Sequence, residues 1–186
     1  MERREVENRL TGERIVFTRT TADTGGASVT FDLFLRPSGA VDFEHFHARQ
    51  VETFRVRRGV LSLRIDGQRR ELRAGEELTI PPGTPHTLRN DTGEEIELEV
   101  EYRPALRSEW WLLHFHAAVD HLGRELSLLE IAPHLASGVE IYPARPGRWL
   151  VRLTLALLAP VARLLGRDRV LVDAAEAWHR ERAGAP

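Results

Sequence analysis

Apolar and polar residues alternate along most of the first 103 positions, and this period of two is typical of half-buried β-strands. The alternation is clearest over residues 29–36, 61–66 and 95–102, and in the last range every second residue is a glutamate. Shorter segments with the same pattern lie at 13–18, 50–57, 78–80 and 86–89. Strands that each have one apolar face must turn those faces toward one another, so the pattern predicts a mainly β protein built as a jelly-roll barrel.

At Pro104 the period of the apolar positions changes from 2 to 3.6, which predicts helices in the rest of the chain. Ser108 is the candidate cap of the first helix, and Gly123 is its candidate end. Further helices are predicted over about 126–136, 149–165 and 170–182, with a Pro/Gly-rich link at 142–147 before the second of these. All 4 tryptophans lie in this region, so we expect it to fold rather than to be a disordered tail.

These patterns predict an N-terminal arm over residues 1–12, either loose or forming a short edge element, a β-barrel domain over 13–104 and a helical extension over 105–186. We expect the extension to pack on the barrel or on a partner subunit. The segment 149–165 is nearly all apolar, which favours burial against the barrel or in a dimer interface and leaves attachment to a membrane surface as the alternative. Its interior arginines, and Pro160, which we expect to kink or split the helix, argue against a membrane span.

Composition narrows the classes of function. The net charge of -2 gives the chain no general attraction to nucleic acid, and neither a helix-turn-helix segment nor a basic stripe is apparent. The chain has no cysteine, so a metal site would have to use nitrogen and oxygen ligands, and all 26 basic residues are arginine, which excludes lysine Schiff-base chemistry. The first ten residues are charged and carry no secretory signal, so we expect a cytoplasmic location.

Four side chains in the barrel region are candidate metal ligands: His45, His47, Glu52 and His86. His45 and His47 are two residues apart, so on a strand their imidazoles project to the same face. Glu52 begins the next predicted strand and His86 the one after the Pro-rich turn, which predicts a site for one metal ion inside the barrel. Three imidazoles and one carboxylate suit divalent Fe, Mn, Ni, Co, Cu or Zn and leave coordination positions open, as catalytic sites do.

The spacing of these residues resembles the two sequence motifs of the cupin superfamily, and in particular those of small single-barrel cupins. Gly39, His45, His47, Glu52 and Gly59 fill the first motif, and Gly75, Pro81, Gly83, His86 and Asn90 fill the second. The resemblance covers about residues 13–103. It implies a double-stranded β-helix, that is, the jelly-roll cupin barrel, a divalent metal held by the four ligands, and a homodimer.

The resemblance implies a metal-dependent enzyme that acts on a small organic molecule, with a dioxygenase as the leading hypothesis and an isomerase or cyclase as others. Nothing outside the ligands identifies a catalytic base, although Glu52 could leave the metal and serve as one. A non-catalytic small-molecule-binding or sensor cupin is the alternative, and a storage role is a third. Candidates for the wall of the site, which could equally be plain core residues, are Phe43, Phe54, Leu63, Leu88 and Tyr102.

The helical extension carries further histidines, His114, His116, His121 and His134, but they form no tight cluster in the sequence. His116 and Asp120 are spaced by four and are expected to form a hydrogen bond on one helix face. We therefore predict no second metal site. The extension could cover the mouth of the barrel as a lid or brace a contact between subunits.

Overall fold

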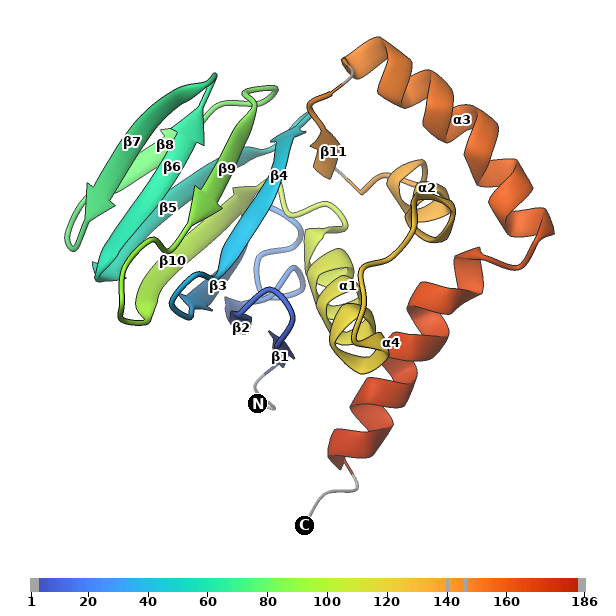
Figure 1. Ribbon diagram of the computed structural model, residues 1–186, viewed down its shortest axis with the longest axis horizontal. Helices are drawn as coiled ribbons and strands as arrows, with labels where there is room; N and C mark the ends of the chain where they lie inside the picture. Colours follow the sequence, from blue (N-terminus) through green and yellow to red (C-terminus); the bar gives the residue numbers. More distant parts are fainter. Residues whose placement is uncertain (1–3, 140, 146, 184–186) are drawn as a thin grey trace.

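Two antiparallel sheets pack face to face, and helices gather at one side of them (Figure 1). The computed structural model describes residues 4–139, 141–145 and 147–183. One sheet has six strands in the order β1-β2-β3-β10-β5-β8, and the other has five in the order β11-β4-β9-β6-β7. The structure is mainly β with helices following the strands, as the periodicity of the sequence predicted.

The six-stranded sheet consists of β1 (Glu5–Asn8), β2 (Glu13–Arg19), β3 (Val29–Leu35), β5 (Val51–Arg58), β8 (Glu77–Ile80) and β10 (Ile96–Arg103). The five-stranded sheet consists of β4 (Ala40–His47), β6 (Val60–Ile65), β7 (Gln68–Arg73), β9 (His86–Arg89) and β11 (Ile141–Pro143). The helices are α1 (Ser108–Leu122), α2 (Leu128–Leu135), α3 (Arg148–Leu164) and α4 (Asp168–Ala183).

Strand β10 shows how the alternating pattern builds the barrel. Its apolar residues Leu98, Val100 and Tyr102 are buried between the sheets. Its glutamates face outward, where Glu99 binds Arg55 at 2.7 Å and Arg57 at 2.5 Å. Burying each large apolar side chain in such a core contributes roughly 1.5–3 kcal/mol, so the inward faces hold the two sheets together.

Two tight turns between strands require glycine, one at Gly67 and one at Gly59. Asp66 and Gly67 both have positive φ, of 48° and 77°, as a two-residue hairpin between β6 and β7 requires. Gly59 has φ of 88°, and a Cβ there would lie 2.4 Å from Cγ2 of Ile96. The turn between β5 and β6 therefore needs glycine both for its backbone conformation and for its close packing.

Helices α1 and α2 differ in how their N-termini are capped. Ser108 is the first residue of α1 rather than its cap, since the cap position is Arg107, and the Ser108 hydroxyl bonds Gln50 instead. Gly123 ends α1 with φ of 62°, as predicted. Helix α2 begins with a capping box in which Ser127 and Glu130 bond each other's backbone.

Helix α3 runs through Pro160 without being split. One face of it packs against α2 and β11, and Val151 and Leu155 are buried there. The opposite face is exposed, so the burial against the barrel that the sequence favoured applies to one side of the helix only. Within the described residues no single helix is long and apolar enough to cross a membrane; α3 and α4 reach that length and composition only together, with a bend of 70° between them.

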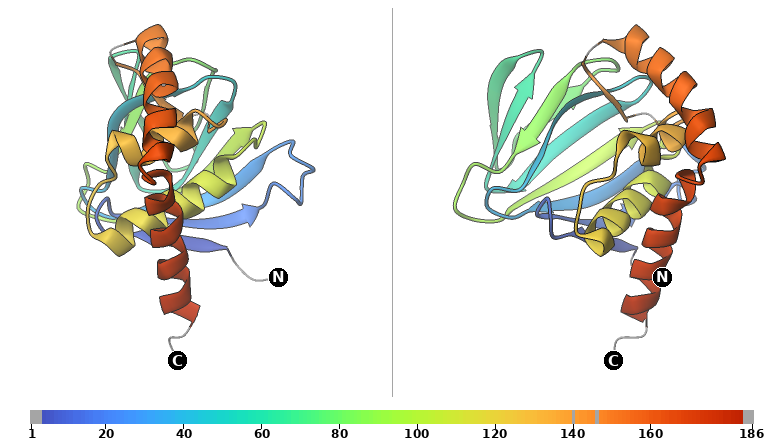
Figure 2. Two further views of the ribbon diagram at one scale, coloured as in Figure 1. Left: turned by 90° about the vertical axis from the view of Figure 1, so that its right-hand side faces the viewer. Right: turned by 45° about the vertical axis from the view of Figure 1, so that its right-hand side comes forward.

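Four strands, β1, β4, β7 and β11, lie outside the segments in which alternation predicted a strand. Strand β1 pairs with β2, so Glu5–Asn8 extend the six-stranded sheet. Strand β11 comes from the predicted link and pairs with β4, which carries two of the candidate ligands. Figure 2 shows α1, α2 and α3 on the side of the barrel that β11 borders. The division of the chain into an arm, a barrel domain and an extension stays a prediction.

Candidate metal centre

The four predicted ligands lie together inside the barrel. His45 and His47 are on β4 and His86 is on β9, where His45 and His86 are paired across the two strands. Glu52 comes from β5 in the opposite sheet. All four are between 1% and 3% exposed, and each offers a donor atom within 4.8 Å of the others. This geometry could hold one metal ion.

Local irregularities turn these side chains inward. The register of β4 against β9 shifts between Val41 and His45, and such a shift re-aims the side chains that follow. The turn before β9 is closed by a hydrogen bond from Thr84 N to Pro81 O, and Gly83 N bonds His47 O at 2.7 Å. The Pro-rich turn and the end of β4 are thus tied together, which fixes His86 beside His47.

A fixed oxygen acceptor orients each imidazole. The Nδ1 atoms of His45 and His86 lie 3.1 Å and 2.9 Å from the carbonyl oxygens of Phe43 and Thr84. The Nδ1 atom of His47 lies 3.3 Å from Oε1 of Gln50. Because these oxygens can only accept, each Nδ1 donates its hydrogen and each Nε2 is left with a lone pair. That is the arrangement usual for histidines that bind metal through Nε2.

The lone pairs converge on a carboxylate oxygen. Oε2 of Glu52 lies 2.8 Å from Nε2 of His86 and 3.2 Å from Nε2 of His47. These three atoms are buried and have no hydrogen-bond partner. Acceptor atoms this close need a positive charge between them, either a proton or a cation, because unpaired buried acceptors are costly. The donor set therefore fits a divalent metal ion.

The electrostatics of the cluster point the same way. Burial, helped by the neighbouring His86 and His47, lowers the pKa of His45 to about 3. Burial alone would raise the pKa of Glu52, but the neighbouring imidazoles of His47 and His86 lower it overall. Burial alone would lower the pKa of His86, but Glu52 raises it overall. Glu52 and His86 thus each favour the charged form of the other, and a bound cation would take the place of a proton between them.

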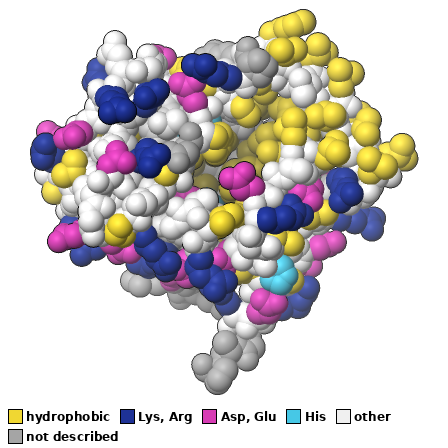
Figure 3. Space-filling view, in the orientation of Figure 1, with side chains coloured by type: hydrophobic (Ala, Val, Ile, Leu, Met, Phe, Trp, Pro, Cys, Tyr) yellow, Lys and Arg dark blue, Asp and Glu magenta, His cyan; other side chains and the backbone are white. Residues whose placement is uncertain are grey.

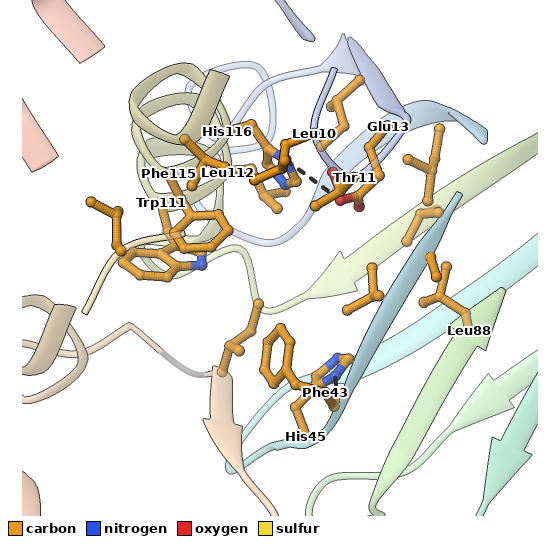
Figure 4. Close-up of a pocket in the computed structure, with 18 of the residues that line it drawn as sticks. Leu10, Thr11, Glu13, Phe43, His45, Leu88, Trp111, Leu112, Phe115 and His116 are labelled. Carbon is orange, nitrogen blue, oxygen red and sulfur yellow. Dashed lines mark hydrogen bonds and ion pairs between the residues drawn. The ribbon is translucent and has the colours of Figure 1, made fainter. Parts of the chain in front are cut away.

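The cluster borders a cavity of about 820 Å³, a size that suits a small organic ligand. His45 and Glu52 line it, and apolar side chains form most of the rest (Figure 4). Barrel side chains form one part of the wall, and α1 and α2 close the other with Trp111, Leu112, Phe115, Ile131 and Leu135. Of the predicted wall residues, Phe43, Phe54, Leu88 and Tyr102 line the cavity, whereas Leu63 lies in the core away from it.

Sequence reasoning missed the part that Gln50 plays. Its amide nitrogen donates to Pro104 O at 2.7 Å and Ala105 O at 3.1 Å, while its oxygen holds His47. Gln50 is fully buried and joins the start of α1 to a ligand. Only the position of a polar residue three after His47 could have suggested it. Asn90 tethers the turn after β9, with its amide nitrogen donating to Leu35 O and Glu94 O.

Tyr102 is a second polar group beside the ligands. Its ring centre lies 4.9 Å from that of His47. Burial raises the pKa of Tyr102, and the charge and hydrogen bond of Glu52 raise it further. Tyr102 therefore keeps its proton and can act as a hydrogen-bond donor at the metal end of the cavity.

The expected pair of His116 and Asp120 does not form. Asp120 accepts hydrogen bonds from the Arg9 side chain and, at 2.8 Å, from Nε1 of Trp178. His116 instead lies 3.4 Å from Asn8 and 3.7 Å from Glu13. Both side chains thus bind residues that are distant in the sequence, and they do not bind each other as their spacing of four had suggested. Over the described ranges, the four barrel ligands form the single group with metal-binding spacing.

Comparison with known proteins places this fold. A family model described as a cupin domain matches residues 33–101. No curated protein matches the chain. One similar solved structure is a cupin-superfamily sugar phosphate isomerase from Silicibacter pomeroyi, with 22% identity and a TM-score of 0.45 over 50% of this chain and 60% of that one. The chain thus spans less than two thirds of that protein.

Two further structures are similar over somewhat longer parts of the chain. The polyketide cyclase RemF from Streptomyces resistomycificus is 21% identical, with a TM-score of 0.48 over 55% of this chain and 74% of that one. An RmlC-like cupin from Shewanella frigidimarina is 19% identical, with a TM-score of 0.49 over 59% and 90%. The family match covers the strands that carry all four candidate ligands. Residues 33–101 of this chain thus match the cupin domain family, and the two-sheet barrel that contains them has the cupin fold.

Proposed function

We propose that this chain is a metal-dependent enzyme that acts on a small, largely apolar organic molecule, with one divalent transition metal held by His45, His47, Glu52 and His86. The convergence of three buried acceptor atoms that have no hydrogen-bond partner carries the proposal. They lie at the border of a large apolar cavity, so a metal there would face the space that holds a substrate.

The donor set limits the metal and its chemistry. Three neutral imidazoles and one carboxylate leave a divalent ion with a net charge of about +1 and suit Fe, Mn, Ni, Co, Cu or Zn. When bound, such a metal supplies Lewis-acid polarisation of a substrate oxygen or a redox centre. His45 and Glu52 line the cavity, so a metal held by them would be accessible to a molecule bound there.

The side chains around the ligands have separate tasks. Tyr102, which keeps its proton and hydrogen-bonds Glu52, can hold that carboxylate in place beside the substrate. The apolar wall excludes water and orients the carbon skeleton. Apart from Tyr102 and the ligands, this end of the cavity offers no proton-transfer group among the described lining residues. A reaction that needs few protein acids and bases fits best, which places dioxygenation ahead of isomerisation or cyclisation.

The test begins with the metal. Purified protein is expected to contain about one divalent metal per chain, and the His45→Ala/His86→Ala variant is expected to contain almost none by elemental analysis. Full occupancy in the double variant would refute the assignment. Metal-free protein loaded anaerobically with Fe(II) is then mixed with catechols and diketones while oxygen uptake is followed. Uptake supports a dioxygenase, and product formation without uptake supports an isomerase or cyclase.

The large apolar cavity also favours a second candidate, a small-molecule-binding cupin without catalysis. The two are separated by turnover: ligands that raise the melting temperature but are returned unchanged with every metal would support binding alone. A homodimer formed through the barrel sheets and a cytoplasmic location remain predictions from the sequence.

A further inference from the structure

The cavity has a second group of polar side chains, away from the metal ligands. Thr11, Glu13 and His116 lie together in Figure 4, and apolar side chains separate them from His45. Glu13 comes from β2, His116 from α1, and Thr11 from the turn between β1 and β2. The proposed metal chemistry uses none of them.

Two of these groups, Glu13 and Thr11, lack the partners that buried polar atoms normally have. Glu13 and His116 are each 5% exposed. The contact between Glu13 Oε2 and His116 Nδ1 is 3.7 Å, which is too long for a hydrogen bond, and over the described residues the structure shows no donor to this carboxylate. The Thr11 hydroxyl is buried and has no hydrogen-bond partner either.

An ion pair does not explain this arrangement. Burial lowers the pKa of His116, so its ring is neutral near pH 7 and gives the carboxylate no positive charge. Asn8 contacts the ring at 3.4 Å and receives the backbone N–H of Leu10 and Thr11, so this corner is rigid. A rigid, buried carboxylate beside an unpaired hydroxyl is costly unless a ligand completes it.

We infer that Thr11, Glu13 and His116 form a second subsite, which binds a hydroxyl group at the end of the ligand remote from the metal. The inference depends on the proposed function only in that it places the other end of the ligand at the metal. A ligand hydroxyl can donate to Glu13 while it accepts from Thr11, whereas a carboxylate or phosphate would be repelled by Glu13. Aromatic side chains between the two ends, Phe31, Trp111 and Phe115, favour a flat ring system. The ligand class is therefore an elongated aromatic compound that carries an oxygen at each end.

Matched probes test this subsite. The affinities of 2-naphthol and 2,6-dihydroxynaphthalene are measured by calorimetry, with metal-loaded and with metal-free protein. The diol is expected to bind about tenfold tighter or more, as a hydrogen bond to a charged acceptor gives. In Glu13→Gln and in Thr11→Val this preference is expected to shrink several-fold while the affinity for 2-naphthol stays within about twofold. Glu5→Gln, an exposed glutamate on β1, is the control.

A wild-type protein without preference for the diol, or variants that keep it, would overturn the inference. The preference in metal-free protein does not depend on the metal, so it can hold even where the metal assignment fails. Stability gives a second readout. Because Glu13 has no donor, Glu13→Gln is expected to melt at the same temperature as the wild type or higher. A melting temperature lower by about 4 °C or more would show a structural ion pair instead.

A separate observation concerns the outer face of α3. Trp149 is 75% exposed, Leu157 63% and Leu164 87%, and more exposed apolar residues of the same helix lie between them. Figure 3 shows apolar side chains gathered on the side of the molecule where Figure 1 places α3. Exposed apolar surface of this size on one helix marks an interaction surface.

The charges around this face identify the partner. Residues 141–167 contain five arginines and no acidic residue. Arg152, Arg163 and Arg167 are exposed. A second copy of the same face would meet like charges without an acidic partner, whereas an anionic lipid surface would pair with the arginines and take up the leucines and the tryptophan. The geometry points to α3 as a membrane-surface helix that lies flat on anionic lipid.

Vesicle flotation tests this surface. The full chain is expected to float with phosphatidylcholine vesicles that contain phosphatidylglycerol and to bind pure phosphatidylcholine several-fold more weakly. Leu157→Glu/Leu164→Glu is expected to lose binding, and Leu128→Glu, an exposed leucine of α2, to keep it. Absence of binding to the anionic vesicles, or equal binding by the double variant, would overturn the proposal. A dimer that dissociates in the double variant, without vesicle binding, would identify a second copy as the partner.

Discussion

At the scale of single residues, the site depends on how each imidazole is held. Two ligands are held by backbone carbonyls of their own strands or turns, which mutation of a side chain cannot remove. His47 is held by the Gln50 side chain, which also bonds the start of α1. Gln50 is therefore the position where the metal affinity can be changed without touching a ligand.

Replacing Gln50 with alanine is expected to weaken metal binding about 10- to 100-fold, because His47 loses the acceptor that fixes its ring. Competition with a chelating dye measures the affinity. Gln50→Glu keeps an oxygen acceptor and is the matched control, expected to retain more of the affinity. Equal affinities for wild type and Gln50→Ala would show that the contact does not position His47.

Metal occupancy is expected to fall as the pH is lowered through the pKa of His86. Glu52 raises that pKa, so protons compete for His86 at a higher pH than for His45, whose pKa is about 3. The ligand is neutral and available above its pKa and charged below it, so occupancy falls as the pH is lowered. Elemental analysis after equilibration between pH 8 and pH 5 measures it. Full occupancy at pH 5 would contradict the prediction.

At the scale of elements, what the sequence could predict follows from which contacts are local. The strands were predictable because alternation is a local pattern, and the four ligands because motif spacing is local too. Strand β11 was not, since its three residues gain their conformation only by pairing with β4, far away in the sequence. The sequence of α3 shows that the helix is largely apolar, but it does not show that only one of its faces packs against the rest of the chain.

The capping box of α2 gives a prediction at this scale. Glu130 binds Arg124 and Ser127, and these hydrogen bonds, with Arg124 as the first contributor, lower the pKa of Glu130 to about 2. Such a carboxylate stabilises the fold above its unfolded pKa of about 4.3, and the effect is lost as the pH falls toward 2. Glu130→Gln should therefore destabilise the protein by about 1–2 kcal/mol at pH 7.

Urea unfolding at pH 7 and at pH 3 checks this, since the difference between wild type and Glu130→Gln should shrink at the lower pH. The exposed Glu125, five residues earlier, offers the control Glu125→Gln. A difference that is the same at both pH values would show that the charge of Glu130 is not what matters.

At the scale of the whole molecule, the helical part is a component of the site, because α1 and α2 form a large share of the cavity wall. The sequence left open whether these helices cover the barrel mouth or brace a subunit contact. The choice depends on packing between segments distant along the chain, which periodicity does not encode. Because α1 and α2 line the cavity, the structure favours a role in covering the barrel mouth.

A chain truncated after Pro104 is expected to aggregate or to lose ligand binding, because the barrel side of the cavity and the site of Gln50 would open to water. Light scattering and metal analysis measure the outcome. A truncated protein that is soluble, monodisperse and fully loaded with metal would refute a packing role for the helices.

The pairing of β11 with β4 also restricts how two copies of the chain can assemble. An open edge beside β4 would let the five-stranded sheet continue into a neighbouring molecule, directly next to His45 and His47. Here Ile141–Pro143 occupy that edge, with Ile141 opposite His47. A dimer built by sheet continuation would have to use β7, β8, β1 or the far side of β11. The strand that bears two ligands is thereby kept out of subunit exchange, and the metal site can stay intact whether the chain is alone or paired.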